Sequence, residues 1–243
     1  MLTSIHTFDA AAGCDATTFQ PCSDKALSNL IVYVNAFRTV YGINAGIPET
    51  EAVATGRYTE DTYYNGNPWY LTTIAVAEQL YDALTVWGQQ GSLEVTSVSL
   101  RFFRTFNSSI AVGTYAASSS QYTALTAAIK EYADGFIEVV AKYTPGDGSL
   151  AEQYNRNTGV PLSAADLTWS YASVLTAFAA RDGFVPASWG ADGLTAPSSC
   201  SPGGGGGGGG DTVAVTFKVN AQTVLGGILK PRYSHEHDSH VWS

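Results

Sequence analysis

Hydrophobic residues recur at steps of three and four along most of the first 200 positions, the spacing that places them on one face of an α-helix. Four such runs cover residues 23–41, 68–88, 122–139 and 163–183, and a shorter run covers roughly 97–106. We find no βαβ pattern among these runs. The sequence therefore predicts about five helices in an all-α domain.

Polar residues at the start of three runs are typical of helix caps. Ser23 precedes the first run, and Asn67 before Pro68 indicates an N-cap followed by the first helical residue. Ser163 and Asp166 form a capping-box-like start in which Asp replaces the usual Glu or Gln. We expect helices to begin at these three places.

The composition changes after Cys200. Pro202 is followed by eight consecutive glycines, residues 203–210, which predict a flexible linker with a span of about 15 Å. Residues 211–219 then alternate as a single strand, which cannot bury its own apolar face. Residues 226–243 lack periodicity, so we expect an unfolded tail there rather than a metal site, although the tail contains three histidines.

Composition and charge exclude several classes of protein. Hydrophobic residues make up 45% of the 243 positions, enough for a packed core and too many for a disordered chain. The formal net charge of −9 disfavours nucleic-acid partners, and no apolar run reaches the ~20 residues of a membrane span. Charged residues are only 14% of the chain, a surface that suits neutral, hydroxyl-rich ligands, although an aromatic-rich core also accounts for this composition.

Cysteines and a glycosylation motif indicate an extracellular protein. Cys14 and Cys22 lie close together and Cys200 lies far away, as in a secreted chain with one local pair and a leftover cysteine. Asn107-Ser108-Ser109 is an N-glycosylation triplet. The N-terminal residues have neither a basic end nor an apolar stretch, so no signal peptide is expected. A secreted origin then implies that the chain is a fragment of a longer protein.

Four short stretches carry the most specific signal in the chain. They are Gly-Arg-Tyr-Thr-Glu-Asp-Thr-Tyr-Tyr-Asn-Gly-Asn-Pro-Trp at 56–69, Leu-Ala-Glu-Gln-Tyr at 150–154, Leu-Ser-Ala-Ala-Asp-Leu-Thr-Trp-Ser-Tyr at 162–171 and Val-Pro-Ala-Ser-Trp-Gly at 185–190. In order and spacing they resemble the C-terminal part of the catalytic domain of fungal glucoamylases, glycoside hydrolase family 15. That family consists of exo-acting, inverting enzymes that release glucose from starch ends.

The resemblance covers roughly residues 2–200 and implies about half of an (α/α)6 barrel. It divides the chain into a catalytic part at 1–200, a glycine-rich linker at 201–211 and a truncated remnant of a starch-binding domain with a disordered tail at 212–243. The expected partners are starch, maltooligosaccharides and glucose, with no nucleic acid and no membrane. The family is secreted, and neither a cofactor nor a metal is expected.

The resemblance also implies the residues that perform the chemistry. Inverting enzymes use a general acid and a general base whose carboxyl groups lie ~6.5–9.5 Å apart. Glu152 matches the general base, and Ser163 matches a serine that donates a hydrogen bond to it. The stretch that bears the family's acid is absent, and Glu60 and Asp61 match a sugar-binding loop rather than that acid.

Further residues match positions that contact the sugar or support the pocket. The substrate-binding residues implied by the resemblance are Arg57, Tyr58, Glu60, Asp61, Tyr63, Trp69, Gln153 and Trp169. Two simpler interpretations stay open: Arg57 in an ion pair with Glu60 or Asp61, and Trp169 in the core. The resemblance implies a disulfide between Cys14 and Cys22, with Cys200 unpaired. The alternative to a truncated enzyme is an inactive carbohydrate-binding or gene-fragment remnant.

Overall fold

The computed structural model describes residues 2–187, which lie within one compact unit, Met1–Asp192. Its α-helices are α1 Leu2–His6, α2 Asp24–Ala36, α3 Tyr70–Gln90, α4 Leu100–Phe106, α5 Ser120–Lys142 and α6 Thr168–Arg181. Its short strands are β1 Ser92–Val95, β2 Gly113–Ala116, β3 Gln153–Tyr154 and β4 Pro161–Leu162. Cys200, the glycine linker, the expected strand at 211–219 and the histidine-containing tail lie outside the described residues.

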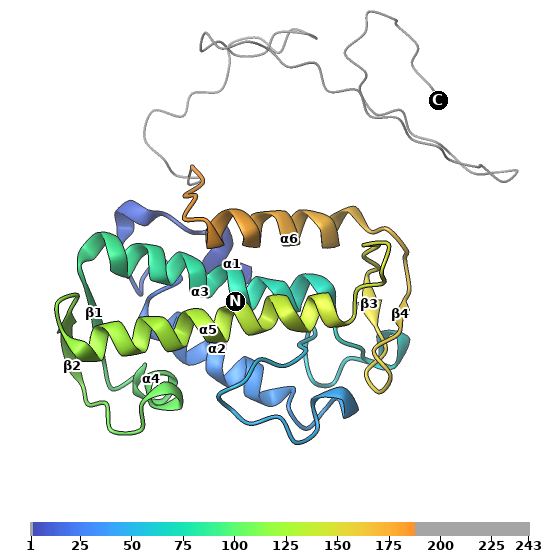
Figure 1. Cartoon of the computed structure of the whole chain (residues 1–243), viewed down its shortest axis with the longest axis horizontal. Coiled ribbons are helices and arrows are strands. Elements are labelled where there is room, and N and C mark those ends of the chain that lie inside the picture. The colour runs from blue at the N-terminus through green and yellow to red at the C-terminus, as the bar shows by residue number, and fades with distance from the viewer. Residues whose placement is uncertain (1, 188–243) are drawn as a thin grey trace, which may run out of the picture. The chain divides into compact units, whose positions relative to one another are not determined.

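The long helix α3 lies between α5 and α6 and packs most extensively against these two (Figure 1). It is buried on nearly all sides because its sequence is apolar or small around the whole helix, not along one stripe. The side chains of α6 that face α3 are small: the buried residues of α6 are Ser170, Ser173, Ala177 and Ala180. Small side chains let two helix backbones approach closely, so α6 lies flat against α3.

Two hydrophobic clusters hold the helices together. The larger lies among α2, α3, α4 and α5, where Phe106 makes edge contacts with Phe102 and Tyr132. The smaller includes Tyr70 and Ile74 of α3 and Tyr154 of β3. This second cluster therefore anchors the strand that follows Glu152.

The all-α prediction is confirmed, and the predicted helix starts have mixed outcomes. Ser23 caps α2, because its Oγ accepts a hydrogen bond from the Ala26 amide over 3.3 Å. The predicted cap at Asn67 and Pro68 is wrong, since α3 begins two residues after Pro68, at Tyr70. There the Pro68 carbonyl instead accepts from the backbone amide of Tyr154 over 3.1 Å, which keeps the chain extended.

The predicted capping box before α6 is also wrong. Ser163 and Asp166 both adopt positive φ angles, 70° and 50°, and α6 begins only at Thr168. Neither side chain bonds the first turn as a cap, because each is engaged elsewhere: Ser163 with Glu152, and Asp166 with the hydroxyl of Tyr171. The loop before α6 is thus shaped by tertiary contacts.

Two antiparallel strand pairs were not expected from the sequence. β1 pairs with β2, and β3 pairs with β4. Their strands have only four and two residues, too short for alternation to be recognised. The second pair, β3 and β4, is a hairpin that follows Glu152 directly.

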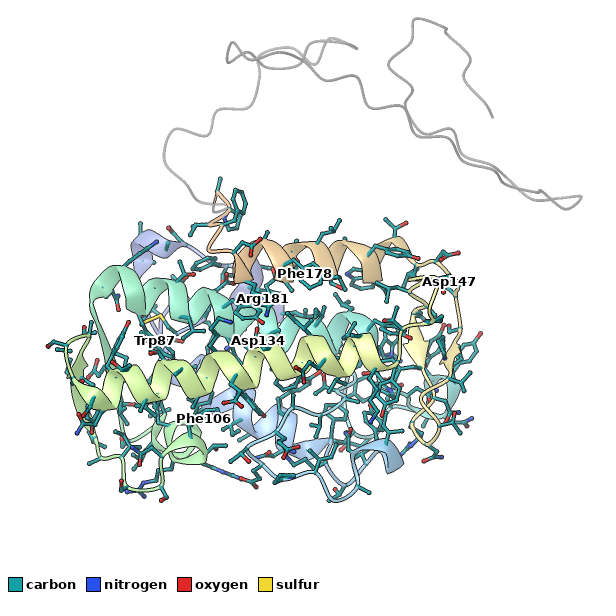
Figure 2. The ribbon with its side chains drawn as sticks, viewed as in Figure 1. Trp87, Phe106, Asp134, Asp147, Phe178 and Arg181 are labelled. Carbon is teal, nitrogen blue, oxygen red and sulfur yellow. A yellow bond between two sulfur atoms is a disulfide. The ribbon has the colours of Figure 1, made fainter. Side chains whose placement is uncertain are left out.

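The expected disulfide between Cys14 and Cys22 is present, with a Cα–Cα distance of 4.9 Å, and it joins the segment after α1 to the start of α2 (Figure 2). Arg181 of α6 contacts Asp134 of α5 over 2.9 Å. Within residues 2–187, none of the helices has the length and apolarity to cross a bilayer.

Candidate active site

Glu152 lies just before β3, half-buried, with one carboxylate oxygen fixed by two donors. Its Oε2 accepts a hydrogen bond from Ser163 Oγ over 2.5 Å and another from Gln153 Nε2 over 2.8 Å. Its backbone amide donates to the Ala164 carbonyl over 2.8 Å. Among the described residues, Oε1 has no hydrogen-bond partner, so it is the oxygen left to act on a water molecule.

Contacts of neighbouring residues fix the backbone around Glu152. Tyr154 is fully buried, its hydroxyl lies 2.8 Å from Thr73 Oγ1, and its ring stacks on that of Tyr143 at 5.0 Å. Burial raises the pKa of Tyr154 well above its ordinary value, so this hydroxyl stays neutral. On the other side, Ser170 Oγ donates to the Ala151 carbonyl over 2.7 Å. These contacts hold Glu152 on rigid elements.

A second polar side chain positions Gln153. Asn67 Nδ2 donates to Gln153 Oε1 over 3.3 Å, which leaves the Gln153 amide nitrogen to donate to Glu152. Asn67 is itself oriented by the backbone amide of Arg156, which donates to its Oδ1 over 3.1 Å. Sequence reasoning missed this role because Asn67 has the local pattern of a helix cap, and Gln153 and Arg156 lie far along the chain.

Arg156 ties the loop at 61–67 to the same hairpin. Its Nη1 donates to the carbonyls of Asn65 and Gly66 over 3.0 and 3.3 Å, and Nη2 donates to the carbonyl of Val40. Its guanidinium also lies over the ring of Tyr41, 5.4 Å from the centroid. Nothing in its local sequence indicates this role, because an arginine between two asparagines in a loop is usually exposed.

Arg57 and Asp61 form a bidentate ion pair at the opposite side of the site. Nε and Nη2 of Arg57 each lie 2.8 Å from one oxygen of Asp61. Asp61 is only 7% exposed and also accepts from the Tyr63 amide over 2.9 Å. The pair lowers the pKa of Asp61 and raises that of Arg57 further. The ion-pair interpretation of Arg57 is therefore correct, with Asp61 and not Glu60 as the partner.

Aromatic rings surround the Arg57 guanidinium. Its carbon lies 5.5, 5.1 and 4.9 Å from the ring centroids of Tyr58, Tyr63 and Trp69, within the range of cation–π contact. Trp69 is buried, yet its indole Nε1 has no hydrogen-bond partner in the described part of the chain. Tyr58 and Tyr63 are exposed, so this side of the site presents ring faces and edges to solvent.

Glu152 and Arg57 lie close enough for their charges to interact. The negative charge of Glu152 contributes to the raised pKa of Arg57, and Trp69 forms a backbone bridge with Gln153. The structure thus brings together Glu152, Gln153, Ser163, Arg57, Asp61, Tyr58, Tyr63 and Trp69. Glu60 and Trp169 make no hydrogen bond or ring contact with this group. Trp169 is 56% exposed, so the core interpretation of this residue is wrong.

Comparison with known proteins gives a consistent result. A sequence profile described as Glycosyl hydrolases family 15 matches residues 1–179. The chain is 66% identical over 226 residues to Glucoamylase-1 of Schizophyllum commune, covering 93% of this chain and 39% of that protein. It is 56% identical over 221 residues to a glucoamylase of Neurospora crassa, covering 90% of this chain and 35% of that one.

Solved structures show the same partial coverage. The family 15 glucoamylase from Hypocrea jecorina matches with a TM-score of 0.77 and 62% identity, over 82% of this chain and 34% of that chain. The Hormoconis resinae glucoamylase matches with a TM-score of 0.75 and 47% identity over the same shares, 82% and 34%. These matches confirm the expected resemblance and the predicted part of an (α/α)6 barrel. The chain spans between a third and two-fifths of these relatives.

Proposed function

Because the chain belongs to glycosyl hydrolase family 15, we propose that it is the part of a glucoamylase that carries the general base, Glu152. The enzyme would release glucose from the non-reducing ends of starch and maltooligosaccharides, with inversion at the anomeric carbon. One observation supports this proposal above the others: Oε2 of Glu152 is held by Ser163 and Gln153, while Oε1 has no partner among residues 2–187.

This geometry suits a general base. Two donors on Oε2 fix the plane of the carboxylate, so Oε1 points in one direction and can accept a hydrogen bond from a water molecule. As the water oxygen bonds to the anomeric carbon, one of its protons passes to Oε1 and the glycosidic carbon–oxygen bond breaks. The departing sugar oxygen must receive a proton from a second group.

Neither Asp61 nor Glu60 is a suitable proton donor. Asp61 has both carboxylate oxygens engaged by Arg57, and this pairing lowers its pKa below the ordinary 3.8, so it stays ionised. Glu60 is exposed and makes no side-chain hydrogen bond or ion pair with the other described residues. We therefore propose that the general acid comes from a part of the barrel outside these residues, and that this chain alone lacks enzyme-like activity.

We propose that the sugar is bound by Arg57, Tyr58, Glu60, Asp61, Tyr63, Trp69, Gln153 and Trp169. The exposed edge of the Arg57 guanidinium can donate to sugar hydroxyls while Asp61 holds its other edge. The Trp69 indole nitrogen, buried without a partner, can donate to a hydroxyl group. Aromatic faces pack well against the C–H faces of a sugar ring.

The proposed context is extracellular, with residues 201–211 as a linker and residues 212–243 as the truncated remnant of a starch-binding domain and a disordered tail. The Cys14–Cys22 disulfide supports an oxidising compartment. A second candidate function is a catalytically inactive carbohydrate-binding or gene-fragment remnant. The unsuitability of Glu60 and Asp61 as proton donors supports this alternative, and an assay of glucose release distinguishes the two.

The assay measures glucose release from maltotriose by four samples. They are the chain alone, the chain mixed with the preceding barrel segment of the Schizophyllum commune relative, and the same mixture with Glu152→Gln or Glu131→Gln. Glu131 is an exposed glutamate on α5 and serves as the matched control. We expect release only in the mixtures, with Glu152→Gln lowering the rate by about 10²–10⁴-fold and Glu131→Gln leaving it unchanged. Release by the chain alone would show that an acid lies within it, and an inactive mixture would favour the remnant.

A further inference from the structure

The turn between α4 and β2 carries a chemical motif that the proposed function does not use. It holds Asn107, Ser108 and Ser109, the single Asn-X-Ser/Thr triplet in the sequence with a residue other than Pro in the middle. The loop between α4 and β2 lies at the opposite end of the molecule from β3 and β4 (Figure 1). A modification there would leave the Glu152 site open.

The side chains of this triplet are arranged around the Asn107 carboxamide oxygen. Oδ1 accepts a hydrogen bond from Ser109 Oγ over 2.8 Å and another from the Ser109 amide over 3.1 Å. The amide nitrogen Nδ2 has no hydrogen-bond partner among the described residues. Both interactions draw electrons toward Oδ1 and leave Nδ2 as the free end of the group.

The backbone presents this group outward. Asn107 is extended, with φ −145° and ψ 100°, directly after the last turn of α4. The turn is closed by the Ile110 amide, which donates to the Asn107 carbonyl over 3.1 Å, and Arg104 Nε donates to the Ile110 carbonyl over 3.3 Å. Ile110 is buried, whereas Ser108 and Ser109 are exposed. The turn thus holds the Asn107 side chain in a fixed position where it is accessible for modification.

We propose that Asn107 is an N-glycosylation site. In the reaction, Nδ2 bonds to the anomeric carbon of the first sugar of a lipid-linked oligosaccharide diphosphate. The bond between that carbon and the diphosphate oxygen breaks, the lipid diphosphate leaves, and Nδ2 loses one proton to the transferase or to solvent. The hydrogen bond from the Ser109 hydroxyl to Oδ1 withdraws electrons from Nδ2, which makes the Nδ2 proton easier to lose as the new bond forms. The site depends on passage through a glycosylating compartment and not on Glu152.

The experiment directs the full chain into the secretory pathway of a yeast through a fused signal peptide. Both the medium and the endoplasmic-reticulum fraction are treated with peptide N-glycosidase in ¹⁸O-water and analysed by mass spectrometry. We expect deglycosylation to convert Asn107 to an ¹⁸O-labelled aspartate in at least half of the recovered chains, and we expect no glycan on Asn107→Gln.

Variants of the serines separate the hydroxyl's role from general effects on folding. Ser109→Ala should abolish the glycan, Ser109→Thr should restore it, and Ser108→Ala should leave it in place, because only residue 109 bonds to Oδ1. An unmodified Asn107 in wild-type chains from both fractions would overturn the proposal, and so would a glycan that persists in Ser109→Ala. Activity is not measured, so failure here does not affect the assignment of Glu152.

Discussion

Ser163 Oγ donates a hydrogen bond of 2.5 Å to Oε2 of Glu152 from a residue whose backbone is left-handed, with φ 70°. A non-glycine residue in this region costs on the order of 1 kcal/mol or more, and such residues cluster at functional sites. The β3–β4 hairpin places the two residues side by side. The strained serine and the carboxylate therefore act as one unit.

Replacing Ser163 separates the hydrogen bond from the strain. Ser163→Ala loses the hydroxyl and keeps the unfavourable φ, whereas Ser163→Gly loses the hydroxyl and relieves the strain. In the reconstituted enzyme we expect both variants to lower kcat by roughly 10- to 100-fold, the equivalent of about 1.5–3 kcal/mol for a bond to a charged group. Urea unfolding should show the glycine variant to be the more stable of the two. Unchanged kcat in both would show that the bond does not orient the base.

Asn67 should act on the reaction through Gln153. In Asn67→Ala, Gln153 Oε1 loses its partner in a fully buried place, so the amide no longer holds Glu152 in one orientation. We expect kcat for maltotriose to fall about tenfold with little change in KM, and the free energy of unfolding to fall by about 1–3 kcal/mol. Thr62→Ala, in the same loop and exposed, is the control. A loss of stability with kcat preserved would make Asn67 a structural residue only.

The sequence predicted the long helices because their apolar periodicity extends over many turns. It predicted the wrong start for α3 because the side chain of Asn67 donates a hydrogen bond to Gln153, 86 positions away. Such a long-range contact leaves no signal in the local sequence. The same reason explains Ser163, which bonds Glu152 in place of the first turn of α6. A side chain that makes a tertiary hydrogen bond is no longer available to cap a helix, whatever its local propensity.

For the candidate site, residue identities came from the resemblance and their support came from the structure. Glu152 by itself has the sequence context of an ordinary loop glutamate. Arg156 and Tyr154, which fix the hairpin, have no pattern that distinguishes them from other loop residues. Their roles depend on contacts with Gly66, Thr73 and other residues that are distant in the sequence. Such contacts cannot be predicted before the fold is known.

Asp82 should make stability depend on pH. It is 4% exposed on α3, and burial, followed by the nearby charge of Glu78, raises its pKa from 3.8 to about 8. Between these values the folded chain keeps a proton that the unfolded chain has released, so stability falls as pH rises. One such group changes the unfolding free energy by up to about 1.4 kcal/mol per pH unit.

Urea unfolding from pH 4.5 to 8.5 measures this dependence. Asp82→Asn should flatten the slope and be more stable than wild type at pH 7, because the amide needs no proton to stay neutral. The exposed Asp182→Asn is the control and should keep the wild-type slope. Equal slopes for wild type and Asp82→Asn would contradict the prediction. Glu78, whose pKa burial also raises and which accepts a bond of 2.7 Å from Thr176 of α6, keeps its own contribution in both chains.

The outer side of α6 should make the isolated chain self-associate. Leu175 and Phe178 are 67% and 42% exposed there, and Phe178 is labelled in Figure 2. Exposed apolar side chains gathered on one helix face promote association. We expect light scattering to show dimers or larger species at micromolar concentration, and a shift toward monomer in Leu175→Lys with Phe178→Ser. Val32→Lys on α2, a singly exposed apolar residue, is the control. A monodisperse wild-type monomer with a sharp cooperative melt would contradict this expectation.

The central claim, that Glu152 is the general base, is tested most directly by chemical rescue in the reconstituted enzyme. α-D-Glucosyl fluoride is the substrate because fluoride leaves without a proton, so the general acid does not limit the rate. Glu152→Ala should hydrolyse it at least about 10²-fold more slowly than wild type or Glu131→Ala. Added azide, which needs no base, should restore turnover, and NMR should identify the product as β-glucosyl azide. Undiminished hydrolysis by Glu152→Ala, or an α-configured azide product, would contradict the assignment.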